Sequence, residues 1–180
     1  PTRAEAEAAC QGEPTEYFNR QAKPSAVKGL QNPPSWRSDT VLPLHADVIA
    51  EAWAVDAACS GNPGQMEYRG VDLRTGQELF RIGPMLGTNN IGEFLAIVHA
   101  LALQAKQGIC LPIYSDSRNA LAWIKGRHCK TKLSRSAASA CAFALIDRAE
   151  AWLATHHFTN PLYKWETSQW GEIPADFGRK

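Results

Sequence analysis

The segment from Trp53 to Gly64 constrains the fold more than any other part of the chain, because an apolar run there leads into one aspartate, Asp56, close to a turn of small residues. Burial of a carboxylate costs free energy unless the group finds a partner. Asp56 is therefore either a turn-forming residue, which is a common use of aspartate, or one part of a polar site that other segments complete.

Apolar periodicity and turn residues predict an α/β domain over residues 47–180. Short connections favour an antiparallel meander of the first three strands, and a helical crossover favours a fourth strand parallel to the first. The prediction is a five-stranded mixed sheet, three strands antiparallel and two parallel, flanked by helices. The expected strands are 48–56, 66–72, 78–85, 109–114 and 162–165, and the expected helices are 91–107, 117–125 and 134–156.

Residues 1–46 differ in composition from the rest. Residues 1–11 carry Ala and Glu at a density that could form a short helix, and residues 12–46 contain five prolines with Gly, Ser, Asn and Gln between them. This composition predicts an N-terminal arm or linker rather than a second core. The formal net charge of +1 gives no general preference for acidic partners. No apolar run is long enough to span a membrane, and the scattered cysteines favour a reducing, cytoplasmic setting without a zinc site. No feature indicates an obligate protein partner.

Acidic residues occur where the predicted elements can bring them together. Asp56 and Asp116 each follow a strand at one edge of the sheet, and Glu93 lies near the start of the helix between them. Asp176 lies in the last segment. Carboxylates that converge repel one another, and a divalent cation removes that repulsion. Oxygen ligands without His or Cys favour Mg²⁺ or Mn²⁺.

Four short motifs with these acids occur in order: Asp56-x-x-Cys59-x-Gly61-Asn62-Pro63-Gly64, Thr88-Asn89-Asn90-x-x-Glu93, Tyr114-Ser115-Asp116-Ser117 and Ala175-Asp176. Over residues 47–180 the chain resembles a type-1 ribonuclease H domain. The resemblance implies an endonuclease that cuts the RNA strand of an RNA/DNA hybrid and leaves 5′-phosphate and 3′-hydroxyl ends. It also implies two Mg²⁺ ions, with Mn²⁺ as a substitute, and metal ligands at Asp56, Glu93, Asp116 and Asp176.

The same resemblance assigns hybrid contacts to Cys59, Asn62, Asn89 and Asn90. An amide can donate and accept hydrogen bonds at once, and the 2′-hydroxyl is the group that distinguishes RNA from DNA. Simpler roles are a turn for Asn62, a helix cap for Asn89 or Asn90 and small-residue packing for Cys59.

A basic segment follows the third motif. In the family, such a segment contacts phosphates of the DNA strand, and the corresponding residues are Lys125, Arg127, Lys130 and Lys132. A solvated basic face is the simpler interpretation.

The chain departs from the family pattern before Asp176, where many members carry a histidine. Glu166 lies near that position and could act as a proton carrier, or it could be a surface residue. Residues 2–10 resemble weakly the end of an N-terminal hybrid-binding domain. Two alternatives for the function are a hybrid-binding protein with weakened catalysis and a DNA-acting nuclease of the same fold.

Overall fold

A computed structural model describes residues 42–178, so residues 1–41 of the predicted arm lie outside the described residues. The strands are β1 (Trp53–Gly61), β2 (Gly64–Asp72), β3 (Glu78–Gly87), β4 (Ile113–Ser115) and β5 (Leu162–Lys164). The helices are α3 (Asn89–Gln107), α4 (Arg118–Lys125), α5 (Ala140–Thr155) and α6 (Thr167–Trp170).

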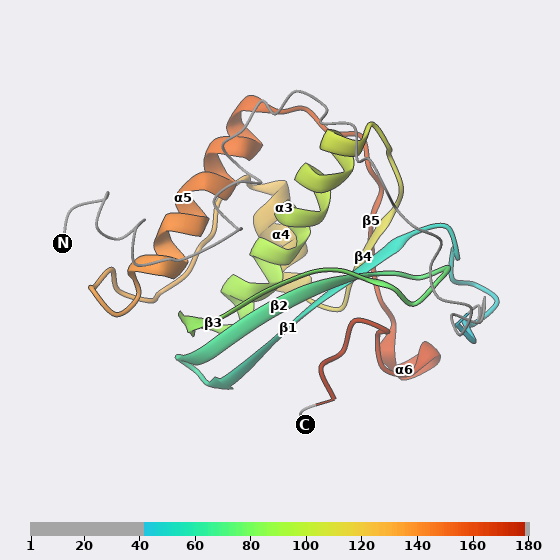
Figure 1. The fold of residues 1–180 in the computed structure, drawn as a ribbon, viewed down its shortest axis with the longest axis horizontal. Helices are drawn as coiled ribbons and strands as arrows, with labels where there is room; N and C mark the ends of the chain where they lie inside the picture. The colour runs from blue at the N-terminus through green and yellow to red at the C-terminus, as the bar shows by residue number, and fades with distance from the viewer. Residues whose placement is uncertain (1–41, 179–180) are drawn as a thin grey trace, which may run out of the picture.

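The five strands form one mixed sheet in the order β3-β2-β1-β4-β5. The pairs β1/β2 and β2/β3 are antiparallel, and the pairs β1/β4 and β4/β5 are parallel. Helices α3, α4 and α5 cover one face of the sheet, whereas α6 and the C-terminal segment lie toward the other (Figure 1). The predicted α/β fold with its mixed sheet is confirmed.

One apolar core packs against each face of the sheet. Alternate residues of β1, such as Val55 and Ala57, belong to the larger core together with apolar residues of α3 and α5. Ala54 points to the opposite face and packs with Tyr114, Trp165 and Ile173 in the smaller core. This alternation is the period of two that a strand buried on both faces requires.

The first strand begins later than predicted and extends beyond Asp56. The stretch 48–52 contains bends, and the Ile49 amide donates to the Tyr114 hydroxyl at 3.1 Å. The β1/β2 ladder continues to the pair Gly61–Gly64. The expected turn over residues 60–65 is therefore reduced to Asn62 and Pro63, because both flanking glycines belong to the ladder.

Helix α3 begins two residues earlier than predicted. The Thr88 hydroxyl accepts from the Ile91 amide at 3.3 Å, and Gly108 ends the helix with a φ of 70°. Both caps are the ones that the sequence favours. Glu93 lies one turn inside the helix, which is the position that brings it over β1.

Two other elements are shorter than expected because side chains satisfy the backbone. The Leu111 amide donates to the Gln104 side chain at 2.6 Å, so residues before Ile113 do not join β4. Ser139 Oγ donates to the Ser134 carbonyl at 2.8 Å, and α5 starts only at Ala140. Such local hydrogen bonds compete with helices and ladders.

Candidate metal centre

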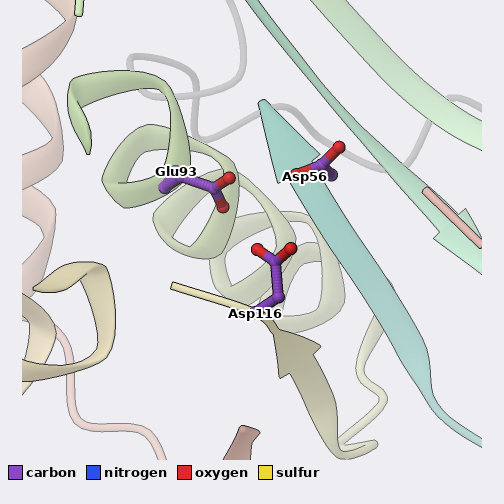
Figure 2. Close-up of side chains that lie close together, drawn as sticks. All are labelled: Asp56, Glu93 and Asp116. Carbon is purple, nitrogen blue, oxygen red and sulfur yellow. The ribbon is translucent and has the colours of Figure 1, made fainter. Parts of the chain in front are cut away.

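Three carboxylates meet at the edge of the sheet where parallel pairing ends. The last β1/β4 pair is Val55 with Ser115, so Asp56 and Asp116 both follow it directly. Helix α3 supplies Glu93, and ligand oxygens of all three residues lie within 4.8 Å of one another. Figure 2 shows the three side chains converging from β1, α3 and the end of β4.

Glu93 is fixed by hydrogen bonds from both strands. Its Oε1 accepts from the Ala57 amide at 3.2 Å, and its Oε2 accepts from the Ser115 hydroxyl at 3.4 Å. The Ser115 oxygen in turn accepts from the Ser117 amide at 3.1 Å. Glu93 is 2% exposed, so its carboxylate is held in one place and can act as a rigid ligand.

Burial and mutual repulsion dominate the electrostatics of the cluster. Burial raises the pKa of Asp56 to about 7, and the charge of Asp116 adds to this rise although a hydrogen bond with Glu93 opposes it. Burial also raises the pKa of Glu93 well above its usual range, and the charge of Asp56 adds to it. The cluster therefore favours either a bound proton or a bound cation.

The donor set fits a divalent cation. Between residues 42 and 178, neither Asp56 nor Glu93 forms an ion pair with a basic side chain. The grouped oxygens are carboxylates, which are the ligands that Mg²⁺ and Mn²⁺ prefer. The three acids could therefore hold a divalent metal ion at this edge of the sheet.

Asp176 lies beside the cluster but outside the group within 4.8 Å. It lines the same cavity of about 360 Å³ as Asp56, Glu93 and Asp116, and its charge contributes to the raised pKa of Asp56. It occupies a turn and not a helix, because its amide donates to the Ile173 carbonyl at 2.8 Å and Pro174 interrupts the segment.

The predicted hybrid contacts separate into two groups. Cys59 and Asn89 line the cavity with the acids. Asn62 is exposed in the β1/β2 turn, and Asn90 is half-buried at the start of α3. The Cys59 thiol lies 3.7 Å from the Gly87 carbonyl and burial raises its pKa, so it is a neutral group at the cavity wall.

The basic segment is anchored to α5. The Arg127 guanidinium donates to the Leu153 carbonyl near the end of that helix. The Cys129 amide donates to Glu150 at 2.8 Å, and His128 contacts the same carboxylate at 2.8 Å. Its lysines, by contrast, point into solvent: Lys125, Lys130 and Lys132.

Glu166 does not line the cavity of the acids. It is the N-cap residue of α6 and lines a second cavity with Asp47, Tyr114 and Trp170 among others. Glu166 thus lines a cavity beside the smaller core and not the cavity that the four acids share.

Three residues at this site carried no role in the sequence prediction. Ser115 orients Glu93, Phe177 lines the cavity beside Asp176, and Arg69 contacts the segment that carries Asp176. Ser115 had a visible signal, since a serine sits between a buried strand and an aspartate. Arg69 had none, because the carbonyls that it contacts in this segment are more than 100 positions away along the chain.

The sequence model of the RNase H family matches residues 50–164, a span that contains Asp56, Glu93 and Asp116 and ends before Asp176. The chain belongs to the RNase H family.

Similar solved structures include an N-terminal RNase H domain from Mycobacterium tuberculosis, with 20% identity, coverage of 66% of this chain and 89% of that chain, and a TM-score of 0.41. RNase H1 from Halobacterium salinarum has 20% identity, coverage of 66% and 86%, and a TM-score of 0.41. A compost-derived RNase H1 in complex with an RNA/DNA hybrid has 19% identity, coverage of 66% and 86%, and a TM-score of 0.40.

Among residues 42–178, no helix combines the length and the apolar character that crossing a bilayer requires.

Proposed function

We propose that this chain is an endonuclease that hydrolyses the RNA strand of RNA/DNA hybrids and leaves 5′-phosphate and 3′-hydroxyl ends. The observation that carries the proposal is the group of Asp56, Glu93 and Asp116, whose oxygens lie within 4.8 Å of one another in a chain of the RNase H family. A similar structure in that family holds an RNA/DNA hybrid.

The proposed cofactor is a pair of Mg²⁺ ions, which Mn²⁺ can replace. Asp56, Glu93 and Asp116 would hold them, with Asp176, which lines the same cavity, as the fourth ligand. When bound, such ions activate water as a nucleophile and stabilise the leaving oxygen.

The protein's own contribution is rigid placement of these ligands. Glu93 receives hydrogen bonds from Ala57 and Ser115 and cannot turn away from the cavity. The high pKa of the Asp56 carboxyl also means that its proton must leave before a cation binds. We therefore expect cleavage to increase as the pH rises through neutrality.

Recognition of the hybrid would involve the residues at the cavity rim. Cys59 and Asn89 line the cavity, and Asn62 and Asn90 lie on the elements that flank it. We assign them to the minor groove of the hybrid, where 2′-hydroxyls are displayed. Exposed Lys125, Lys130 and Lys132 are the candidates for phosphate contacts, whereas Arg127 is engaged by the Leu153 carbonyl.

The proposed division of the chain is a catalytic domain at 47–180 and an N-terminal arm at 1–46. Helices and strands of the described part begin at Trp53, and the site draws on residues from Asp56 to Phe177. The arm is therefore expected to be dispensable for cleavage itself.

A duplex comparison tests the proposed function. Matched RNA/DNA, RNA/RNA and DNA/DNA duplexes are incubated with the full chain, once with Mg²⁺ and once with a chelator. We expect cleavage of the RNA strand in the hybrid with Mg²⁺ alone. Binding of the hybrid without cleavage would support the alternative of a hybrid-binding protein, and preferential cutting of DNA/DNA would support the DNA-acting nuclease.

A further inference from the structure

Arg69 occupies the position on β2 directly opposite Asp56 on β1. Residues that face each other in an antiparallel pair project to the same face of the sheet. An arginine at this position could form an ion pair with Asp56 and would then compete with any cation for the carboxylate. Its guanidinium instead has other partners.

All three guanidinium nitrogens of Arg69 donate hydrogen bonds. Nε donates to the Ala175 carbonyl at 2.6 Å, and Nη2 donates to the Asp176 carbonyl. Nη1 donates to Glu78 Oε2 at 3.1 Å, and the side chain is 18% exposed. The charge is thus directed to the backbone of the C-terminal segment and to β3.

The segment held by Arg69 forms a turn that follows Ile173, which is buried in the smaller core. The Asp176 amide donates to the Ile173 carbonyl at 2.8 Å, and the Gly178 amide donates to Asp176 Oδ2 at 2.8 Å. The ring of Phe177 lies 5.0 Å from the guanidinium carbons of both Arg69 and Arg81. Phe177 and Asp176 line the cavity of the acids together.

We propose that Arg69 is a positioning residue that holds Asp176 at the edge of the carboxylate cluster. Its planar fork reaches two successive carbonyls at once, a geometry that a lysine ammonium does not reproduce. The same hydrogen bonds keep its charge from Asp56, so the cluster stays open to a cation. This inference rests on the proposed function in so far as Asp176 acts as the fourth ligand.

Three variants of the full chain test this role. Arg69→Gln removes the charge and the fork, and Arg69→Lys keeps the charge alone. Arg81→Gln is the matched control, because Arg81 shares the contacts with Glu78 and Phe177 while its guanidinium donates to Glu78 and not to the carbonyls of residues 175 and 176. Thermal unfolding verifies that each variant is folded.

The first readout is amide hydrogen exchange in the metal-free protein, which does not depend on activity. Arg69→Gln and Arg69→Lys should exchange the amides of Asp176 and Gly178 about tenfold faster than wild type, because loss of two charge-assisted hydrogen bonds loosens the turn. Arg81→Gln should exchange at the wild-type rate within about twofold.

The second readout is a double-mutant cycle on hybrid cleavage. Arg69→Gln should lower kcat about tenfold or more with the KM for the hybrid nearly unchanged, and it should have no added effect when Asp176 is already replaced by Asn. Wild-type exchange or wild-type kcat in Arg69→Gln would overturn the inference while leaving the proposed function intact. So would full activity in Arg69→Lys, or equal additive losses in the cycle. A wild-type chain that does not cut the hybrid instead overturns the proposed function, and the exchange result still decides whether Arg69 holds the segment.

Discussion

Replacing Asp56 by Asn should stabilise the metal-free protein while abolishing its chemistry. Burial raises the pKa of Asp56 from 3.8 to about 7. The folded state then binds more protons than the unfolded state between these values, so the free energy of unfolding falls as the pH rises from about 4 to about 7. The loss is complete above pH 7 and is regained on acidification.

The magnitude follows from the shift and from the geometry. A shift of about three pKa units corresponds to about 4 kcal/mol at 1.36 kcal/mol per unit. By Coulomb's law, two charged carboxylate oxygens within 4.8 Å of one another repel by about 3 kcal/mol or more at an effective dielectric constant of about 20. Because the Asn amide keeps some polar burial cost, we expect Asp56→Asn to gain about 2 kcal/mol at pH 8 and to raise Tm by roughly 5 °C or more.

The assay is thermal unfolding at pH 5 and pH 8, with chelator and with Mg²⁺. The wild-type Tm should fall between the two pH values in chelator and recover when Mg²⁺ is added at pH 8. Mg²⁺ at about a hundred times its dissociation constant adds about 2.7 kcal/mol to the free energy of unfolding. Asp56→Asn should show a smaller fall and no recovery. The control is Asp147→Asn, which makes the same chemical change at an ion pair with Arg135 on the surface of α5.

A lower Tm for Asp56→Asn than for wild type in chelator at pH 8 would refute this reasoning. It would mean that Asp56 is a stabilising part of the metal-free fold and not a charge that the fold holds for a cation.

Further predictions concern the periphery of the site. Glu166→Gln should leave kcat within about twofold of wild type, because Glu166 lines a different cavity; a tenfold loss would restore its role as a proton carrier. Replacing Lys130 and Lys132 by Gln should reduce the slope of log binding constant against log salt by about 1 to 2, with an unchanged slope as the contrary result. Arg127→Gln should instead lower Tm, because it loses the hydrogen bond from the guanidinium to the Leu153 carbonyl. A wild-type Tm with weaker hybrid binding would show that Arg127 contacts the hybrid and does not stabilise the fold. Removal of residues 1–46 should leave kcat on the hybrid largely intact, and a large loss would show that the arm takes part.

The sheet could be predicted from the sequence because the spacing of apolar residues and the turn-forming residues determine strands and turns over short stretches of the chain. The hairpin of β1 and β2, the caps Thr88 and Gly108 and the crossover to β4 all follow from residues close together in the chain. The predicted element bounds were wrong where a side chain forms hydrogen bonds with backbone groups that would otherwise pair in the element. Gln104 does this before β4, and Ser139 does it before α5.

The acids Asp56, Glu93 and Asp116 could be predicted because each lies within or directly after a regular element, and such elements place them at one edge of the sheet. Asp56, Glu93 and Asp116 indeed converge. The position of Asp176 could not be derived in this way, since no helix or strand carries it. It depends on Arg69, a contact between residues remote in sequence that no local pattern encodes.

The most direct measurement of the central claim is cleavage of a hybrid labelled in its RNA strand, by wild type and by Asp56→Asn at saturating Mg²⁺. Wild type should produce RNA fragments with 5′-phosphate ends and leave the DNA strand whole, and Asp56→Asn should be folded and at least about a thousandfold slower. Equal rates for the two proteins, or cleavage by wild type that persists in chelator, would contradict the assignment of the carboxylate cluster as the catalytic metal centre.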